Sequence, residues 1–328
     1  MPTAFVTGAT GFLGRHLIDV LLEENWTITA MVRDPKAASE TLDNRVTLVK
    51  GDLINPSDTR KAMPDTLDCV FHAAADTSTW AKEARRQQLV NEEGTRSILQ
   101  AVLDKNVKRM VHVSSIAVFG EHHEPITEET PRKGAKSWVS YIQTKSYAER
   151  KVKEAVDRGF DAVIVNPTHI VGRYDNHNWA RLIQMMAEDT LPGTPPGGGN
   201  FANGRAVAEG IVAAFHKGKA GNNYILGGPK ASFEEFLTIA ADKIGKGAPK
   251  KPLPAWLLKT MASILSFISI FTGKRPMITP EEALFSTEEQ DARSDKAISE
   301  LGYRIVPLEQ SIDESIEFLK ENNLLKIK

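Results

Sequence analysis

Tyr141 and Lys145 stand four residues apart in a stretch with the pattern of a helix, so a phenol and an ammonium share one helical face. A free tyrosine ionises near pH 10 and is a poor proton donor or acceptor at neutral pH. A cation one turn away favours the phenolate, so we expect Lys145 to lower the pKa of Tyr141 and make it a general acid or base. The spacing alone is common, and a surface tyrosine beside a solvated lysine would also produce it.

A pair of serines precedes this tyrosine, where a predicted strand over residues 109–114 ends in Ser114 and Ser115. A hydroxyl at the carboxyl end of a strand in a parallel sheet opens into the ligand crevice and can polarise a substrate carbonyl. We assign this role to Ser115, with Ser114 as the alternative. Serine, tyrosine and lysine together predict a centre for proton transfer at a carbonyl or alcohol oxygen.

A glycine-rich loop separates the first predicted strand, residues 3–7, from a predicted helix over residues 12–23. Gly8 permits a tight turn, Gly11 lets the backbone approach a pyrophosphate, and Gly14 lets the helix pack on the strand. The helix N-terminus offers unpaired N–H groups and its positive dipole end to an anion. At the first strand–helix junction, this spacing predicts a dinucleotide site rather than an ordinary turn.

The residue at the end of the second predicted strand, residues 27–33, determines whether such a site prefers NAD or NADP. An acidic residue there binds the ribose hydroxyls of NAD, but Arg33 occupies the position and can bind a 2′-phosphate through two N–H groups. Lys36 adds positive charge, and Arg15 is a further candidate. Asp34 is the competing NAD-selecting acid. We predict that the cofactor is NADP.

Short β-branched runs alternate with helical segments in the first half of the chain. Strands are predicted at residues 3–7, 27–33, 46–50, 69–72, 109–114 and 162–166, with helices near 12–23, 56–63, 91–105 and 141–157. This alternation predicts an α/β fold, a doubly wound parallel sheet with helices on both faces and a crevice at the carboxyl ends of its strands.

The alternation of strands and helices ends after Pro167. Residues 191–203 are dense in proline and glycine and are predicted to be a loop; a helix over 207–217, a strand over 223–226 and a final amphipathic helix over 308–322 follow. We therefore divide the chain into a dinucleotide-binding domain of residues 1–170, to which 205–228 returns, and a smaller, mostly helical substrate lobe of residues 171–204 and 229–328.

Further motifs occur in an order typical of one family. They are Gly51-Asp52-Leu53, His72-Ala73-Ala74-Ala75, Asn91-Glu92-Glu93-Gly94-Thr95 and Asn166-Pro167. With the glycine loop, Ser115, Tyr141 and Lys145 they resemble the extended short-chain dehydrogenase/reductases of the NAD-dependent epimerase/dehydratase superfamily. The match covers most of residues 3–172. The turn Val32-Arg33-Asp34-Pro35 is similar to that of the dihydroflavonol reductase and 3β-hydroxysteroid dehydrogenase branches.

The resemblance implies a Rossmann domain in which Ser115, Tyr141 and Lys145 are catalytic and Lys145 also holds the cofactor ribose. It further implies that Asn91 supports the active site. A helix-cap role for Asn91 and a loop-capping role for Asp52 are the alternatives. The implied cofactor-binding residues are Gly8, Thr10, Gly11, Phe12, Leu13, Gly14, Arg33, Lys36, Asp52, Leu53, Ala73, Ala74, Ala75, Tyr141, Lys145, Pro167 and Ile170.

Two departures from family patterns narrow the expected activity. Dehydratases of the family carry an acidic pair beside the serine, where this chain has Ile116 and Ala117. Epimerases place a basic residue where this chain has Asn200. Their usual pair of aspartates is replaced here by Asn203 and Ala206. The epimerase pattern therefore does not predict the local structure of this loop or the closure of the lobe. We expect NADPH-dependent reduction of a fairly apolar ketone or aldehyde, or the reverse oxidation. Nucleotide-sugar epimerisation with tightly bound NAD is the alternative, and a non-catalytic NADP sensor is the weaker third.

The amino-acid composition limits the partners and the cellular compartment that we expect. Lys and Arg total 41 against 42 Asp and Glu, a formal net charge of −1, which provides no basic footprint for nucleic acid. Cys69, the single cysteine, cannot form an internal disulfide and suits a reducing cytosol. No secretory signal is expected at the N-terminus. We predict a cytoplasmic protein with a small carbonyl or alcohol substrate and no metal ligands; a homodimer stays open.

One apolar stretch, residues 254–272, complicates this picture. Its only charged residue is Lys259, and basic residues stand on both sides of it. A transmembrane helix needs about 20 apolar residues, so the length is borderline, and hydroxyl residues recur along the stretch. We expect a helix packed inside the substrate lobe. Docking at a membrane interface is the main alternative, and a full membrane span is the least favoured.

Overall fold

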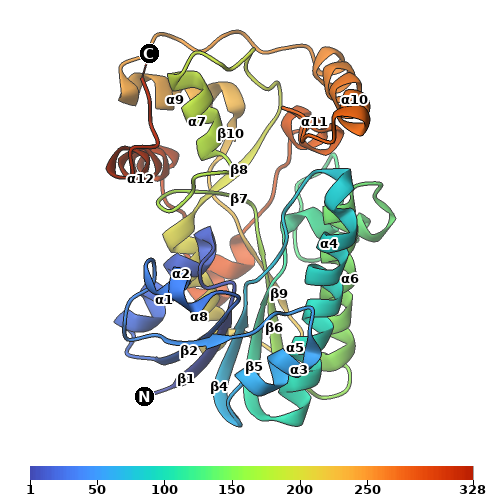
Figure 1. Ribbon diagram of the computed structural model, residues 1–328, viewed down its shortest axis with the longest axis vertical. Coiled ribbons are helices and arrows are strands. Elements are labelled where there is room, and N and C mark those ends of the chain that lie inside the picture. The colour runs from blue at the N-terminus through green and yellow to red at the C-terminus, as the bar shows by residue number, and fades with distance from the viewer. Residues whose placement is uncertain (328) are drawn as a thin grey trace.

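The computed structural model describes residues 1–327, and its centre is a seven-stranded parallel sheet (Figure 1). The strand order is β3-β2-β1-β4-β5-β6-β9. The order reverses direction between β1 and β4, and ligands of doubly wound sheets bind at such a switch point, beyond the carboxyl ends of the strands. The strands are β1 (Thr3–Thr7), β2 (Thr27–Val32), β3 (Thr47–Lys50), β4 (Thr66–His72), β5 (Asn106–Val113), β6 (Ala162–Pro167) and β9 (Asn223–Leu226). The predicted doubly wound fold is confirmed.

Helices cover both faces of this sheet, and alternate side chains of each strand serve the two layers. Val6 of β1 packs in one hydrophobic core with α1 (Phe12–Glu23), α2 (Pro35–Ser39) and α8 (Gly204–Lys217). Its neighbour Phe5 packs in the opposite core, which contains side chains of the three helices α3 (Pro56–Ala62), α5 (Gly94–Asp104) and α6 (Ser140–Val156). Both cores are continuous beneath the crevice, so the strand ends are held on a rigid layer.

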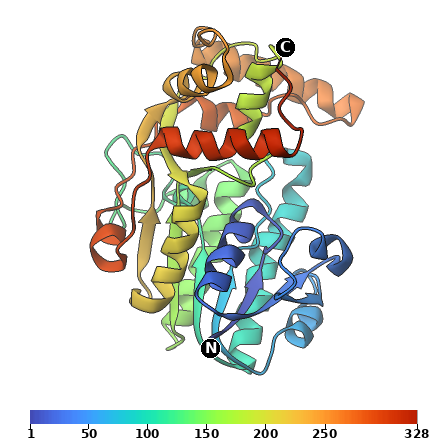
Figure 2. The same cartoon turned by 90° about the vertical axis from the view of Figure 1, so that its left-hand side faces the viewer.

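A second lobe lies beyond the carboxyl ends of the strands (Figure 1). Its core contains α7 (Ala180–Ala187), α9 (Phe233–Ile244) and α12 (Leu308–Glu321), packed around a three-stranded sheet. The red helix α12 crosses the junction between the lobe and the first domain in Figure 2. Two more helices, α10 (Ala255–Thr272) and α11 (Pro280–Thr287), pack on each other through a small separate cluster.

The small sheet of the lobe has the order β10-β8-β7 and corrects the prediction of a loop over residues 191–203. Its strands are β7 (His169–Val171), β8 (Gly198–Asn203) and β10 (Lys230–Ser232). A Cβ on Gly198 would lie 2.5 Å from the carbonyl oxygen of Ala231. The glycines of this run therefore let β8 pass between close backbones in a buried position, where we had expected them to form part of a loop.

The chain returns to the first domain twice after residue 170. Helix α8 packs on α1, and β9 adds to the sheet beside β6. The sequence division had assigned residues 205–228 to the first domain. The second return was not expected. Ala297 and Leu301 of η5 (Ala297–Leu301), placed in the lobe by the sequence division, pack in the core of the first domain with α8 and β9.

Candidate active site

A cleft of about 1680 Å³ runs along the carboxyl ends of the strands, between the sheet and the lobe. The glycine loop occupies one end of it. Gly8 has φ +77°, and its carbonyl oxygen accepts a hydrogen bond from the Gly11 N–H at 3.0 Å. A Cβ on Gly14 would lie 1.9 Å from the same oxygen, so the turn can close only with glycine at that position. The tight turn leaves the N-terminus of α1 facing the cleft, the arrangement that fits a pyrophosphate.

All but one of the residues predicted to bind the cofactor line this cleft. They are Gly8, Thr10, Gly11, Phe12, Leu13, Gly14, Arg33, Asp52, Leu53, Ala73, Ala74, Ala75, Tyr141, Lys145, Pro167 and Ile170. Lys36 does not line it and lies exposed on α2. Arg15 is also directed elsewhere, with its guanidinium 3.8 Å from the centre of the Tyr174 ring. Positive charge at the cofactor end of the cleft therefore depends on Arg33.

Arg33 and Asp34 differ sharply in their surroundings. The Asp34 carboxylate is the N-cap of α2, where it accepts the backbone N–H groups of Lys36 at 3.0 Å and Ala37 at 3.2 Å. Arg33 is exposed at the end of β2, lines the cleft, and makes no hydrogen bond or ion pair with residues 1–327. The acid is therefore engaged locally, whereas the guanidinium is available to an anion.

Ser115 and Tyr141 meet in the middle of the cleft. Ser115 follows the end of β5 and is the N-cap of a 3₁₀ turn, η3 (Ile116–Phe119), in which its Oγ accepts the Ala117 N–H at 3.2 Å. The phenol of Tyr141, in the first turn of α6, lies close enough to the Ser115 side chain for that side chain to influence its pKa, and both residues line the cleft. The second serine points away, since Ser114 Oγ donates to the buried carboxylate of Glu149 at 2.6 Å. Of the two candidates, only Ser115 is placed beside the tyrosine.

Lys145 lies one turn further along α6 and is buried. Its Nζ donates to the Val113 carbonyl oxygen at 2.7 Å, which fixes the ammonium at the end of β5. Burial lowers the pKa of this lysine to about 8, partly opposed by the charge of Glu149. The ammonium is therefore held in the cleft by backbone and sits close to its point of deprotonation at neutral pH.

The pKa of Tyr141 corrects one expectation. We expected Lys145 to lower it, but burial raises it, and the nearby Ser115 side chain offsets only part of that effect. Lys145 does not offset the effect of burial, because its own pKa of about 8 means that it has lost its charge before the phenol ionises. The tyrosine is thus kept protonated at neutral pH, the form that donates a proton, and a cationic nicotinamide beside it would lower the pKa for the reverse step.

Glu149 is a supporting residue that the sequence reasoning missed. Its buried carboxylate accepts hydrogen bonds from Ser114, from Asn166 at 2.9 Å, from Asn223 at 3.0 Å and from Arg132 at 2.7 Å. These partners come from β5, β6, β9 and the loop before α6, so one carboxylate joins the strand ends beneath the centre. The sequence offered one indication of this role, because Glu149 stands four residues after Lys145 and so lies on the same face of the helix.

Asn91 lies within a π-helical turn, η2 (Leu89–Glu93), between α4 (Ala84–Gln88) and α5, rather than at a helix end. Its Nδ2 donates to the Asp76 carbonyl oxygen and to Thr144 Oγ1, both at 3.0 Å, and its Oδ1 accepts the Asp76 N–H at 2.7 Å. Thr144 in turn donates to the Tyr141 carbonyl oxygen at 3.1 Å. Asn91 therefore connects the loop after β4 to the turn of α6 that carries Tyr141, and it is not a helix cap.

The half of the cleft on the lobe side of Tyr141 is mainly apolar. Its lining includes Ile142, Leu182, Met185, Leu258, Met261 and Phe285. The Phe285 ring packs edge-on against the Tyr141 ring at a centroid distance of 6.4 Å. Methionine side chains adapt to irregular shapes, so this wall suits a bulky apolar group.

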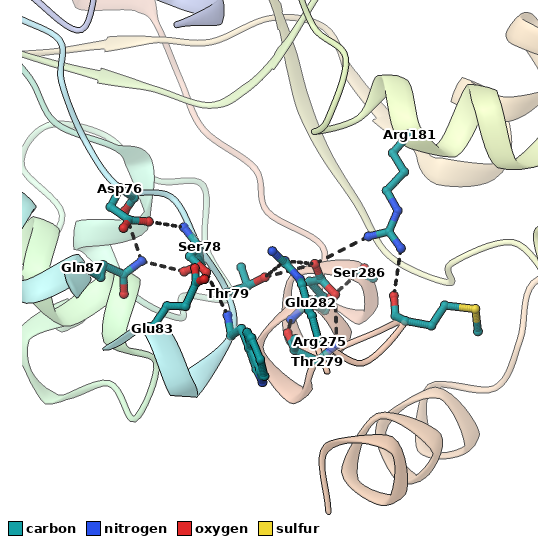
Figure 3. Close-up of polar contacts among 12 residues, drawn as sticks. Asp76, Ser78, Thr79, Glu83, Gln87, Arg181, Arg275, Thr279, Glu282 and Ser286 are labelled. Carbon is teal, nitrogen blue, oxygen red and sulfur yellow. Dashed lines mark hydrogen bonds and ion pairs between the residues drawn. The ribbon is translucent and has the colours of Figure 1, made fainter. Parts of the chain in front are cut away.

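A polar cluster also lines this cleft (Figure 3). Glu282 of α11 accepts hydrogen bonds from Thr79 at 3.1 Å and Arg275 at 2.9 Å, and Arg181 lies 3.9 Å from the same oxygen. Thr79 belongs to the loop after β4, which Gln87 holds through the Ser78 carbonyl oxygen at 2.6 Å. The cluster therefore ties the lobe to the first domain beside the cleft.

The two asparagines that depart from epimerase patterns have structural partners. Asn200 donates to the Gly228 carbonyl oxygen at 3.0 Å and accepts the Ala292 N–H at 2.7 Å. Asn203 is the N-cap of α8 and donates to Glu314 of α12 at 2.8 Å. Asn200 is buried in β8 and does not line the cleft. The segment thus keeps its strand and its cap without the charged residues found in epimerases. Among residues 1–327 no cluster of histidine, cysteine and acidic side chains could hold a metal ion.

Two curated relatives align over nearly the whole chain. A putative dihydroflavonol 4-reductase of Synechocystis sp. is 29% identical over 330 residues, which covers 98% of this chain and 96% of that protein. The 4-hydroxy-2-methyl-3-oxo-4-farnesyl-3,4-dihydroquinoline-1-oxide ketoreductase of Stigmatella aurantiaca is 29% identical over 308 residues, or 91% of each chain.

Solved structures share the fold. The crystal structure of gox2253 superposes with a TM-score of 0.84 at 28% identity and covers 99% of this chain and 100% of that one. The NAD complex of UDP-glucuronic acid 4-epimerase from Bacillus cereus has a TM-score of 0.78 at 21% identity, with 97% and 96% covered, a likeness of fold alone. The sequence model of the NAD dependent epimerase/dehydratase family matches residues 4–227. The chain belongs to this family, the extended short-chain dehydrogenase/reductases.

Proposed function

We propose that this protein is an NADP-dependent reductase of a fairly apolar ketone or aldehyde, able to catalyse the reverse oxidation. The observation that carries the proposal is that Ser115 and Tyr141 line the cleft together, with Lys145 one turn further along α6, between the dinucleotide end of the cleft and its apolar half. A carbonyl oxygen placed between these two hydroxyls would accept hydrogen bonds from both. The rest of the substrate would then contact the apolar wall.

Each residue of the centre has a separate role in the proposed reaction. NADPH, when bound along the glycine loop, supplies the hydride. Tyr141 holds the proton for the carbonyl oxygen, and its raised pKa keeps that proton in place at neutral pH. Ser115 polarises the carbonyl and orients the phenol. Lys145, fixed on the Val113 carbonyl, is positioned to hold the cofactor ribose.

The preference for NADP rests on the contrast at the end of β2. Arg33 lines the cleft with no partner in the described chain, and a planar guanidinium can bind a 2′-phosphate through two parallel hydrogen bonds. Asp34, the competing NAD-selecting acid, is engaged as the cap of α2. Two sequence relatives named as reductases support the direction of the reaction, and the farnesyl group in one of those names agrees with an apolar substrate.

The test is a screen for NADPH oxidation by the purified protein with aromatic aldehydes, β-keto compounds and steroid ketones. We expect consumption of NADPH with apolar carbonyls and little with NADH. Co-purification of tightly bound NAD, together with interconversion of nucleotide sugars and no net oxidation of added NADPH, would refute the proposal and favour an epimerase. A cytoplasmic location and a homodimer stay predictions.

A further inference from the structure

Helix α10 exposes an apolar face that residues 1–327 leave uncovered. Leu258, Ala262 and Ser269 are buried on one side, whereas Phe267 and Phe271 are 62% and 75% exposed on the other. The described chain exposes fifteen large hydrophobic side chains, and seven lie within residues 256–277: Trp256, Ile264, Phe267, Ile268, Ile270, Phe271 and Met277. The expectation of a helix packed inside the lobe therefore holds for one face only. A contiguous apolar patch of this kind marks a docking surface.

The sequence around this patch is rich in basic residues. From residue 243 to residue 280 the sequence contains seven basic residues and no acidic one, in a chain whose formal net charge is −1. Three of the seven, Lys243, Lys246 and Arg275, are paired with acidic residues of other segments. Lys250, Lys251, Lys259 and Lys274 form no ion pair within residues 1–327. Lys82 of the first domain adds a further cation, since its Nζ donates to the Gly273 carbonyl oxygen at the end of α10. The partner of this surface must therefore be apolar within and negatively charged at its rim.

We propose that α10 docks the protein on an anionic lipid bilayer, lying in the interface with its aromatic face toward the acyl chains. Lysines at both ends and beside the helix would then contact anionic headgroups, and Trp256 would lie at the headgroup level. A second copy of the chain fits this surface less well, because two such basic rims would repel each other.

The helix suits the interface better than a full span. It has a mean hydropathy of 1.5 and is apolar enough to cross a membrane by composition. Its 18 residues, however, extend about 27 Å at 1.5 Å per residue, short of a hydrocarbon core of about 30 Å. Its inner face also stays packed on Ala283 of α11 through Leu258 and Ala262. A span would break that packing, whereas docking leaves it intact.

The hydroxyl residues on the outer face do not oppose docking. Thr260 Oγ1 donates to the Trp256 carbonyl oxygen at 2.8 Å, and Ser263 Oγ donates to the Lys259 carbonyl oxygen at 2.9 Å. Each donor is therefore satisfied within the helix, which removes most of the cost of placing it against acyl chains.

Docking would also place the cleft next to the bilayer. Leu258 and Met261 line the apolar half of the cleft from α10, and Met277 lines it from the segment that follows. One helix is thus a wall of the cleft on one side and the membrane contact on the other. Provided that the proposed reductase function is correct, its carbonyl substrates are lipophilic compounds that enter from the membrane.

The test is co-sedimentation of the purified chain with vesicles of phosphatidylcholine containing about a third phosphatidylserine, at low ionic strength. We expect binding that weakens in high salt and on pure phosphatidylcholine. The variant Phe267→Gln/Phe271→Gln should bind at least about tenfold more weakly, since two aromatic anchors are lost and helix propensity is retained. Ile298→Gln/Ile305→Gln, which alters two exposed apolar residues of the first domain, should bind like the wild type.

Three results would overturn the proposal: no binding of the wild type, equal loss in both double variants, or a wild-type dimer that the Phe267/Phe271 variant converts to monomers. The last result would assign the patch to a second copy. NADPH oxidation with a water-soluble aldehyde, measured without vesicles, should be the same in the wild type and both variants. Vesicle binding without carbonyl reduction would refute the proposed function and leave the docking proposal in place. Carbonyl reduction without vesicle binding would refute docking and leave the proposed function in place.

Discussion

Replacing Arg33 with aspartate should reverse the cofactor preference. Arg33 has no partner in the described chain to release, so its interaction with a 2′-phosphate is not offset by a lost contact. Two charge-assisted hydrogen bonds contribute about 1.5–3 kcal/mol each when shielded from water. Because Arg33 is exposed, we discount the total to about 2–3 kcal/mol, or on the order of 10²-fold in affinity. The new carboxylate adds repulsion to this loss.

The assay is the Kd for NADPH and for NADH, from quenching of protein fluorescence at two salt concentrations. NADPH affinity of Arg33→Asp should fall by about 10²-fold or more, while NADH affinity changes little or improves. High salt should shrink the wild-type preference because the pair is exposed.

Two neighbours serve as matched controls. Asp34→Ala removes the cap of α2 and should cost about 1 kcal/mol of stability, with no change in cofactor preference. Lys36→Ala should leave both affinities unchanged, since Lys36 lies outside the cleft. A wild type that prefers NADH, or an Asp34→Ala variant that loses NADH binding while Arg33→Asp keeps NADPH, would refute the reasoning.

Three further predictions concern the centre and its support. Tyr141→Phe should lower kcat by about 10²–10⁴-fold and leave the Kd for NADPH unchanged, because it removes only the proton donor; retention of more than about a tenth of the turnover would remove Tyr141 from its role. NADPH affinity of the wild type should fall as the pH rises through about 8, where Lys145 loses its charge, and Lys145→Arg should abolish this inflection in a binding titration. The pKa of Glu149 lies below its usual value, since Arg132 and the hydrogen bonds from Ser114 and Asn166 outweigh the effect of burial. A carboxyl with a lowered pKa stabilises the fold above its unfolded pKa, and this stability is lost as the pH falls through the lowered value. The resistance of the wild type to urea should therefore fall as the pH is lowered below the ordinary pKa of a glutamate, Glu149→Gln should flatten that dependence, and an unchanged acid profile in the variant would contradict it.

The doubly wound domain was predictable because its signals are local. Hydrophobic periodicity placed β1, β9 and α1 at the residues where they occur, and the spacing of Gly8, Gly11 and Gly14 could serve only one kind of turn. The contrast between Arg33 and an acidic residue is likewise a matter of residue type at the end of a strand. Tyr141 and Lys145 share a helical face by their spacing alone.

Contacts between distant segments decided the rest. The choice of Ser115 over Ser114 depends on Glu149, which attracts one hydroxyl and leaves the other beside Tyr141. The pKa of Tyr141 depends on burial and on the nearby Ser115 side chain, and the pKa of Lys145 also depends on burial.

In the lobe, too, the sequence indicates what a segment can form and the tertiary structure decides the outcome. A run rich in proline and glycine has the composition of a loop, and only the close backbones around Gly198 make it the buried strand β8. The apolar stretch of α10 has the composition of a core helix, and only the position of α11 determines which of its faces is covered. Composition and spacing specify what a segment can form, whereas burial, hydrogen-bond partners and the exposed face follow from what the fold brings against it.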